Sequence, residues 1–107
     1  FGELVRILEA SLEGIKYRGK AEKGDKTIID CLEPTVDMLK NASNIDEEVL
    51  MAALEAGKKG VEYTKQIVAK KGRASYLGER SLGHQDPGAT SCYIMLSTLF
   101  NALSRGI

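Results

Sequence analysis

Apolar residues recur at every third or fourth position in four segments of this chain, and this spacing limits the fold more than any other feature. On an α-helix the spacing gathers the side chains into one stripe, which has to be buried against other helices. No segment shows the alternating pattern of a half-buried strand. The 107 residues are therefore predicted to form one all-α domain, an antiparallel helical bundle. The four stripes are Leu4, Leu8, Leu12 and Ile15; Ile28, Ile29, Leu32, Val36 and Leu39; Val49, Ala53, Ala56, Gly60, Tyr63 and Ile67, with Leu50, Leu54, Gly57, Val61 and Val68 alongside; and Cys92, Leu96, Leu99 and Leu103, flanked by Tyr93 and Phe100.

Residues that start, bend or stop helices give the expected boundaries. The first helix is predicted to end near Gly19. Pro34 lies inside the second stripe, which predicts either a kink or a first turn separate from the main helix. Asp86 followed by Pro87 is predicted to be the N-cap and the first residue of the last helix, because these residue types favour those two positions.

The third helix is predicted to span about residues 46–70 and to begin with a capping pair formed by Asn44 and Glu47. Its buried side is rich in small residues, which let helix axes approach closely. We therefore expect this helix to be central to the bundle. Gly57 and Gly60 each cost up to about 1 kcal/mol in a helix relative to alanine, and close packing would offset that cost.

Composition excludes several classes of partner. Fifteen acidic and fifteen basic residues give a net charge near zero, so neither nucleic acid nor a membrane surface is an expected partner. No apolar run approaches the roughly 20 residues of a membrane span. Cys31 and Cys92 both fall within helical patterns and are predicted to be buried free thiols of a reducing compartment, which indicates the cytoplasm. Two cysteines without a nearby histidine make a poor metal site.

Two connections are unusually polar, at residues 18–27 and 72–88, and an antiparallel bundle could place both at the same end. The first resembles a phosphate-binding loop in composition but lacks its spacing, so, taken alone, a solvated basic turn is the simpler interpretation. The second offers Arg73, whose guanidinium suits phosphate oxygens. The carboxylate of Asp86 would repel phosphate, so a nucleotide would approach it through the ribose or base, and Gly88 permits close backbone approach.

The two loops together carry a more specific signal. RGKAEKGDKT at residues 18–27, followed by GRASYLGERSLGHQDPGATS at residues 72–91, resembles the L subunit of the dihydroxyacetone kinases. More narrowly, it resembles the bacterial type that draws phosphate from the phosphoenolpyruvate phosphotransferase system. The resemblance covers the whole chain but only about the C-terminal half of the family's nucleotide-binding domain. It therefore implies about half of an eight-helix barrel.

The resemblance also implies an ADP site made of six residues that match family motifs. Ile28 stands where the family often has methionine and would line the adenine pocket, and Arg73 would contact phosphate. The family's magnesium-binding motif does not occur here, so magnesium is expected to bind through the missing N-terminal half. The six implied residues are Gly19, Ile28, Arg73, Asp86, Pro87 and Gly88, with Asp25, Lys26 and Thr27 as neighbours that shape the first loop.

The implied activity is phosphoryl transfer in which ADP stays bound as a prosthetic group. A phosphohistidine of the M subunit would phosphorylate it in place, and the K subunit would present dihydroxyacetone as the acceptor. Two alternatives remain open: the nucleotide domain of an ATP-dependent dihydroxyacetone kinase, and a non-catalytic helical interaction module. The GERSLGHQ segment favours the phosphotransferase-system type over the first of these.

Overall fold

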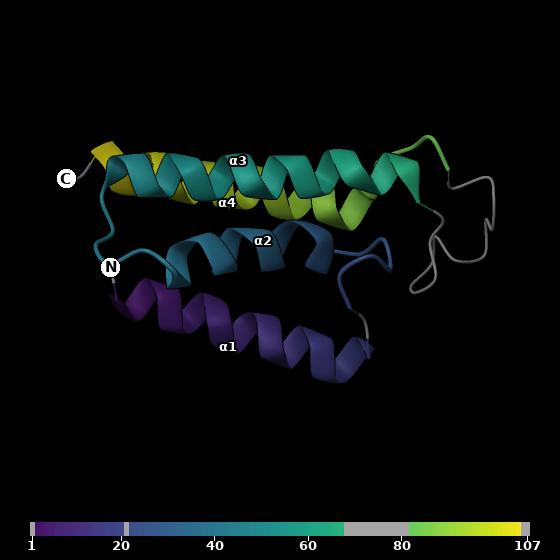
Figure 1. Ribbon diagram of the computed structural model, residues 1–107, viewed down its shortest axis with the longest axis horizontal. Helices are drawn as coiled ribbons and strands as arrows, with labels where there is room; N and C mark the ends of the chain where they lie inside the picture. The colour runs from purple at the N-terminus through teal and green to yellow at the C-terminus, as the bar shows by residue number, and fades with distance from the viewer. Residues whose placement is uncertain (1, 21, 68–81, 106–107) are drawn as a thin grey trace.

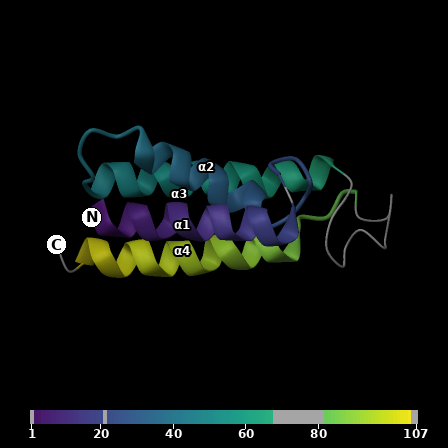
Figure 2. The ribbon, with the colours of Figure 1, turned by 90° about the horizontal axis from the view of Figure 1, so that it is seen from below.

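The computed structural model describes residues 2–20, 22–67 and 82–105. Four α-helices run along the long axis of the molecule and alternate in direction (Figures 1 and 2). The all-α prediction is therefore confirmed, and no strand occurs in these three ranges. The elements are α1 (Gly2–Gly19), α2 (Ile29–Lys40), α3 (Glu47–Tyr63), the short 3-10 helix η1 (Thr64–Gln66) and α4 (Pro87–Arg105).

The helix at the centre of the bundle is α2, which packs against α1, α3 and α4. The sequence had favoured α3 for this position because of its small residues, and this prediction is wrong. The reason is that α2 is short and buried on more than one face, with polar side chains enclosed as well as apolar ones. Its buried residues are Ile29, Asp30, Cys31, Leu32, Thr35, Val36 and Leu39.

The two glycines of α3 do bring it close to α2, as predicted. A Cβ at position 57 would collide with the hydroxyl of Thr35 and lie 3.3 Å from Cys31 Sγ. A Cβ at position 60 would lie 2.9 Å from the carbonyl carbon of Asp30 and closer still to its oxygen. Only glycine fits at this second contact, because the obstacle is the backbone of the facing helix and not a side chain that could rotate away.

Pro34 lies inside α2, and the helix continues through it from Ile29 to Lys40. A separate first turn is therefore excluded. Proline has no N–H group, so the carbonyl of Asp30 cannot receive the usual helical hydrogen bond from position 34. This is the same carbonyl that faces Gly60 on α3. The proline and the glycine are thus two sides of one close contact between the helices.

The beginning and end of α3 differ from the predicted boundaries. The N-cap is Asp46 and not Asn44. The carboxylate of Asp46 accepts a hydrogen bond from the backbone N–H of Val49 at 2.9 Å. Asp46 has the extended backbone that a capping residue needs. The helix also ends earlier than residue 70. At Thr64 it tightens into η1, where the threonine hydroxyl donates to the carbonyl of Val61, a side-chain bond that competes with helix continuation.

The buried face of α4 is rotated slightly from the predicted stripe. Cys92 and Leu96 are buried as expected, but the next buried residue is Phe100, and Leu99 is 40% exposed. A step of four residues, from Leu96 to Phe100, is closer to the helical period of about 3.6 residues than the step of three from Leu96 to Leu99. Phe100 therefore lies nearer to the line of Leu96 than Leu99 does. The aromatic ring therefore fills the core where the sequence had placed Leu99.

Two further predictions concern the thiols and the membrane. Cys31 and Cys92 are both buried and free, as predicted. The neighbouring Cys92 thiol, and then burial, raise the pKa of Cys31, so this thiol stays protonated. Within the described ranges, no helix has the length and apolar character needed to cross a membrane.

Candidate functional site

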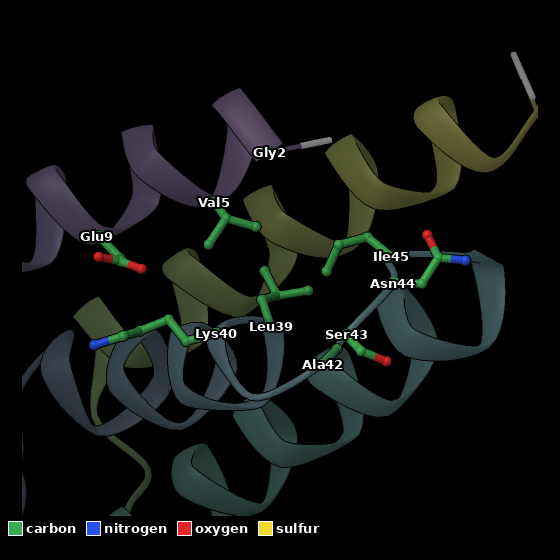
Figure 3. A pocket seen from close by; sticks show the side chains of 9 residues that line it. All are labelled: Gly2, Val5, Glu9, Leu39, Lys40, Ala42, Ser43, Asn44 and Ile45. Atoms are coloured by element: carbon green, nitrogen blue, oxygen red, sulfur yellow. The ribbon is translucent and has the colours of Figure 1, made fainter.

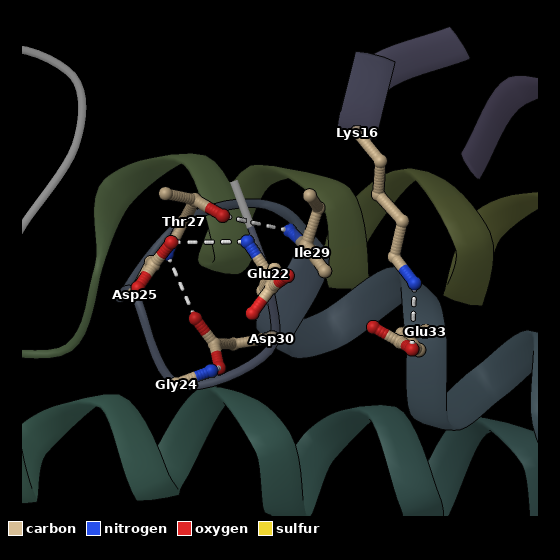
Figure 4. Close-up of polar contacts among 8 residues, drawn as sticks. All are labelled: Lys16, Glu22, Gly24, Asp25, Thr27, Ile29, Asp30 and Glu33. Carbon is tan, nitrogen blue, oxygen red and sulfur yellow. Dashed lines mark hydrogen bonds and ion pairs between the residues drawn. The ribbon is translucent and has the colours of Figure 1, made fainter. Parts of the chain in front are cut away.

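The loop between α1 and α2 is closed on itself by side-chain hydrogen bonds (Figure 4). The carboxylate of Asp30, in the first turn of α2, accepts from the backbone N–H groups of Gly24 at 2.7 Å and Thr27 at 2.8 Å. The hydroxyl of Thr27 accepts from the N–H of Ile29 at 3.2 Å. These bonds satisfy backbone groups that would otherwise be unpaired near the helix start, so the loop has a defined shape. It is more than a solvated basic turn.

Lys26 is the buried basic residue of this loop, with 2% of its surface exposed. Its backbone is left-handed, with φ of 62°, and its ammonium group donates to the carbonyl of Ile67 at 3.1 Å. Burial lowers the pKa of Lys26, and the carboxylate of Asp86 opposes that shift. The side chain therefore links the first loop to the end of η1 and brings positive charge towards the start of α4.

Asp86 caps α4, as predicted. Its carboxylate accepts from the backbone N–H of Ala89 at 2.9 Å, and its own N–H donates to the hydroxyl of Thr64 at 2.8 Å. The residue is only 6% exposed. Burial raises the pKa of Asp86; the N–H of Ala89 and the charge of Lys26 act in the opposite direction, and the carboxylate of Asp30 adds to the increase. This end of the bundle is therefore a small network of buried charges and capped backbone.

The structure brings some of the predicted site residues together. Ile28 is the residue before α2 and is half-buried against the core. Gly88 lies beside it, since a Cβ at position 88 would be 3.9 Å from the Cβ of Ile28. Pro87 and Gly88 are both exposed. A half-buried apolar side chain and an exposed backbone turn thus lie next to each other at the start of α4.

The other predicted residues are less closely tied to this surface. Gly19 is the last residue of α1 and is exposed, at the same end of the bundle as the first loop. Arg73 lies outside the described residues. Among the polar residues of the site, Thr64 was not predicted at all. A threonine at the end of a helical pattern carries no local sign that it will bond to a residue 22 positions away.

This arrangement suits some chemical groups better than others. The carboxylate of Asp86 occupies the N–H of Ala89 in the first turn of α4, so the helix start offers negative charge as well as N–H donors. An anion would be repelled there, whereas hydroxyl groups could donate to the carboxylate. The half-buried side chain of Ile28 next to it suits a flat apolar ring. In the ranges that the structure covers, no three His, Cys, Asp or Glu side chains come together as a metal site would require.

Gly19 lines a cavity of about 550 Å³ along α1, whereas two other cavities contain none of the six predicted residues. One of about 460 Å³ lies at the opposite end of the bundle, between the start of α1 and the connection from α2 to α3 (Figure 3). Val5, Leu39 and Ile45 form its apolar lining. A second cavity of about 360 Å³ lies between the first loop and α3 and includes Lys23 and Lys59.

The family of the chain follows from comparison with known proteins. The model of the DAK2 domain family matches residues 1–101. The chain is 46% identical over 96 residues to the ADP-binding subunit DhaL of a PEP-dependent dihydroxyacetone kinase of Listeria innocua, covering 90% of this chain and 44% of that protein. The corresponding subunit of Escherichia coli is 45% identical over 100 residues, with 91% and 48% covered. The dihydroxyacetone kinase of Citrobacter freundii is 38% identical over 105 residues, with 95% and 17% covered. The chain thus spans about half the length of the DhaL relatives, and it belongs to the DAK2 domain family.

Proposed function

We propose that this chain is the C-terminal part of the nucleotide-binding domain of the L subunit of a phosphoenolpyruvate-dependent dihydroxyacetone kinase, and that it forms one wall of the ADP site. The observation that carries the proposal is the proximity of Ile28 to the exposed Gly88, where an added Cβ would lie 3.9 Å from the Cβ of Ile28. This proximity occurs in a chain whose similar relatives are named ADP-binding subunits.

Each part of the wall has a role that fits its chemistry. Ile28 packs against the adenine ring, because a half-buried apolar side chain favours a flat apolar group. Asp86 accepts from a ribose hydroxyl, and Gly88 lets the nucleotide approach the backbone. Gly19 contacts the nucleotide from the end of α1, and Arg73 binds phosphate oxygens through its planar guanidinium.

Bound ADP, phosphorylated in place by the phosphohistidine of the M subunit, supplies the phosphoryl group that dihydroxyacetone on the K subunit receives. The residues of this chain orient the nucleotide and neutralise charge, which is the main work of proteins in phosphoryl transfer. Magnesium is bound by residues outside this chain. The protein acts in the cytoplasm, a placement supported by two buried free thiols of the kind that reducing compartments maintain.

The test is native mass spectrometry of the protein that contains this chain, followed by calorimetric titration with ADP and magnesium. We expect ADP to be retained through purification, and we expect Ile28→Ser to weaken ADP binding by about tenfold through loss of the apolar contact. Ile94→Ser is the matched control, because Ile94 is 59% exposed on α4. Equal ADP affinity in the two variants would contradict the proposed wall.

The phosphoryl donor separates the alternatives. With the partner subunits present, phosphoenolpyruvate and the phosphotransferase-system proteins should support formation of dihydroxyacetone phosphate, and the ADP should not exchange with free ATP. Rapid exchange with direct use of ATP would favour the ATP-dependent type of kinase. Failure of the protein to bind any nucleotide would favour an interaction module.

A further inference from the structure

Lys26 is buried and has a left-handed backbone. The proposed ADP wall, made of Ile28 and the first turn of α4, does not explain either feature. Of the lysines within the described ranges, only Lys26 is buried. Its left-handed backbone is uncommon for a residue with a Cβ and raises its conformational energy. Enclosing an ammonium group costs further free energy unless the charge is hydrogen-bonded or paired. Such a residue is maintained only where its contacts outweigh both costs.

Those contacts connect the three segments that meet at this end of the bundle. The ammonium group donates to the carbonyl of Ile67, which is 41 positions further along the chain and ends η1. The charge of the ammonium group acts on Asp86, the cap of α4. Asp86 is in turn bonded through its N–H to Thr64 of η1. The lysine therefore closes a network that runs from the first loop through η1 to α4.

The network adjoins both parts of the candidate nucleotide surface along the chain. Lys26 is two positions before Ile28, and Asp86 is two positions before Gly88. A shift of either segment by about one ångström would open the contact between Ile28 and Gly88, and misplacement on this scale is enough to impair a site. The side chain of Lys26 is itself buried and not exposed on this surface.

We propose that Lys26 is a positioning residue, which holds the loop ending at Ile28 against the first turn of α4. This inference rests on the proposed function, because it assigns to Lys26 the alignment of two parts of the ADP wall. The lysine itself acts through Ile28 and Gly88. Its ammonium group is hydrogen-bonded to the carbonyl of Ile67, and its charge acts on the carboxylate of Asp86.

The test compares Lys26→Met, which keeps the length of the side chain but removes the charge, with Lys23→Met as a matched control. Lys23 belongs to the same loop and is exposed. Both variants are made in the protein that contains this chain. Two quantities are measured: the affinity for ADP by calorimetry, and the nuclear Overhauser contact between the Ile28 methyl groups and the α-protons of Gly88 without nucleotide.

We expect Lys26→Met to lose the Overhauser contact and to bind ADP about tenfold more weakly or worse, since hydrogen bonds of charged groups are the stronger ones. Lys23→Met should retain both. Lys26→Arg, which restores a charged donor, should recover part of the affinity. If Lys26→Met does not fold, Lys26→Gln is measured in the same way; its neutral amide keeps a donor but removes the charge, so it should still bind ADP more weakly than the wild type.

Unchanged ADP affinity in Lys26→Met would overturn the inference. So would weakened binding with the Overhauser contact intact, because Lys26 would then act on the nucleotide directly. The contact is measured without ligand, so it tests the positioning role even if the protein fails to bind ADP. Failure to bind ADP would refute the proposed function. The Overhauser contact between Ile28 and Gly88 would then be the one remaining test of whether Lys26 aligns the two segments.

Discussion

Replacing Gly60 by alanine tests the close contact between α2 and α3. In an exposed helix this substitution usually stabilises, by up to about 1 kcal/mol, because alanine has the higher helix propensity. At position 60 the new Cβ would lie 2.9 Å from the carbonyl carbon of Asp30 and closer to its oxygen. Neither atom can move without shifting α2 away from α3. The expected sign is therefore the reverse of the usual one.

The magnitude follows from what has to move. Overpacking a core typically costs about 1–3 kcal/mol, and a clash with rigid backbone belongs at the upper end of that range. After subtraction of the propensity gain, we expect Gly60→Ala to reduce the free energy of unfolding by about 2 kcal/mol. Gly57→Ala should cost less, because its main obstacle is the hydroxyl of Thr35, which can rotate if it gives up its 2.9 Å bond to the carbonyl of Cys31.

The measurement is denaturant unfolding followed by helical circular dichroism, with Gly14→Ala as the control. Gly14 lies within α1, and a Cβ there would meet nothing within 4 Å. We expect this control to be stabilised by up to about 1 kcal/mol. If Gly60→Ala were as stable as Gly14→Ala, the contact with Asp30 would not constrain the packing of α2 on α3, and our account of Pro34 and Gly60 as one contact would be wrong.

Three further perturbations test other parts of the structure. Phe100→Ala should cost about 3–5 kcal/mol in thermal or denaturant unfolding, because the ring is 1% exposed, whereas Leu99→Ala should cost much less; similar losses would contradict the rotated face of α4. Lys16→Met removes a 2.8 Å ion pair with Glu33 whose side chains are 30% and 19% exposed, so the loss should stay within about 1 kcal/mol, and a larger loss would indicate a stronger pair. Asp86→Asn should change how stability depends on pH. Because the pKa of Asp86 is raised, the folded state binds its proton more tightly than the unfolded chain does. The stability from that proton is present below the ordinary pKa of an aspartate and is lost as pH rises through the raised pKa. Relative to Asp86→Asn, the wild-type free energy of unfolding should therefore fall across that window, and a rising difference would refute the shift.

The general architecture was predictable because it depends on local patterns. The spacing of apolar residues predicts four helices, and the pair Asp86 and Pro87 predicts the start of α4 from residue types alone. The N-cap of α3 was harder to predict, because Asn44 and Asp46 both belong to residue types that cap helices. The choice of Asp46 depends on the backbone path of the connection, which the residue types do not specify.

The candidate site was predictable only in part, for a physical reason. The proximity of Ile28 to Gly88 depends on how α2 and α4 pack, so the residues of this surface could be proposed from a resemblance but not from their spacing. The burial of Lys26 was harder still to predict from the sequence. A lysine between an aspartate and a threonine in a polar loop is normally solvated, and its enclosure depends on a carbonyl 41 positions away.

The two buried thiols have a practical consequence for kinetics. Cys31 belongs to α2, the helix that contacts the other three, and Cys92 belongs to the facing side of α4. A thiol reagent reacts only with thiolate that it can reach, so alkylation of either residue in the native protein has to wait for the helices to separate. The rate of labelling, divided by the rate for an unfolded thiol, then gives the fraction of time that each helix spends open when reclosing is fast. Comparing the two cysteines by peptide mass analysis would reveal whether α2 and α4 separate together or one at a time, with no label added to the chain.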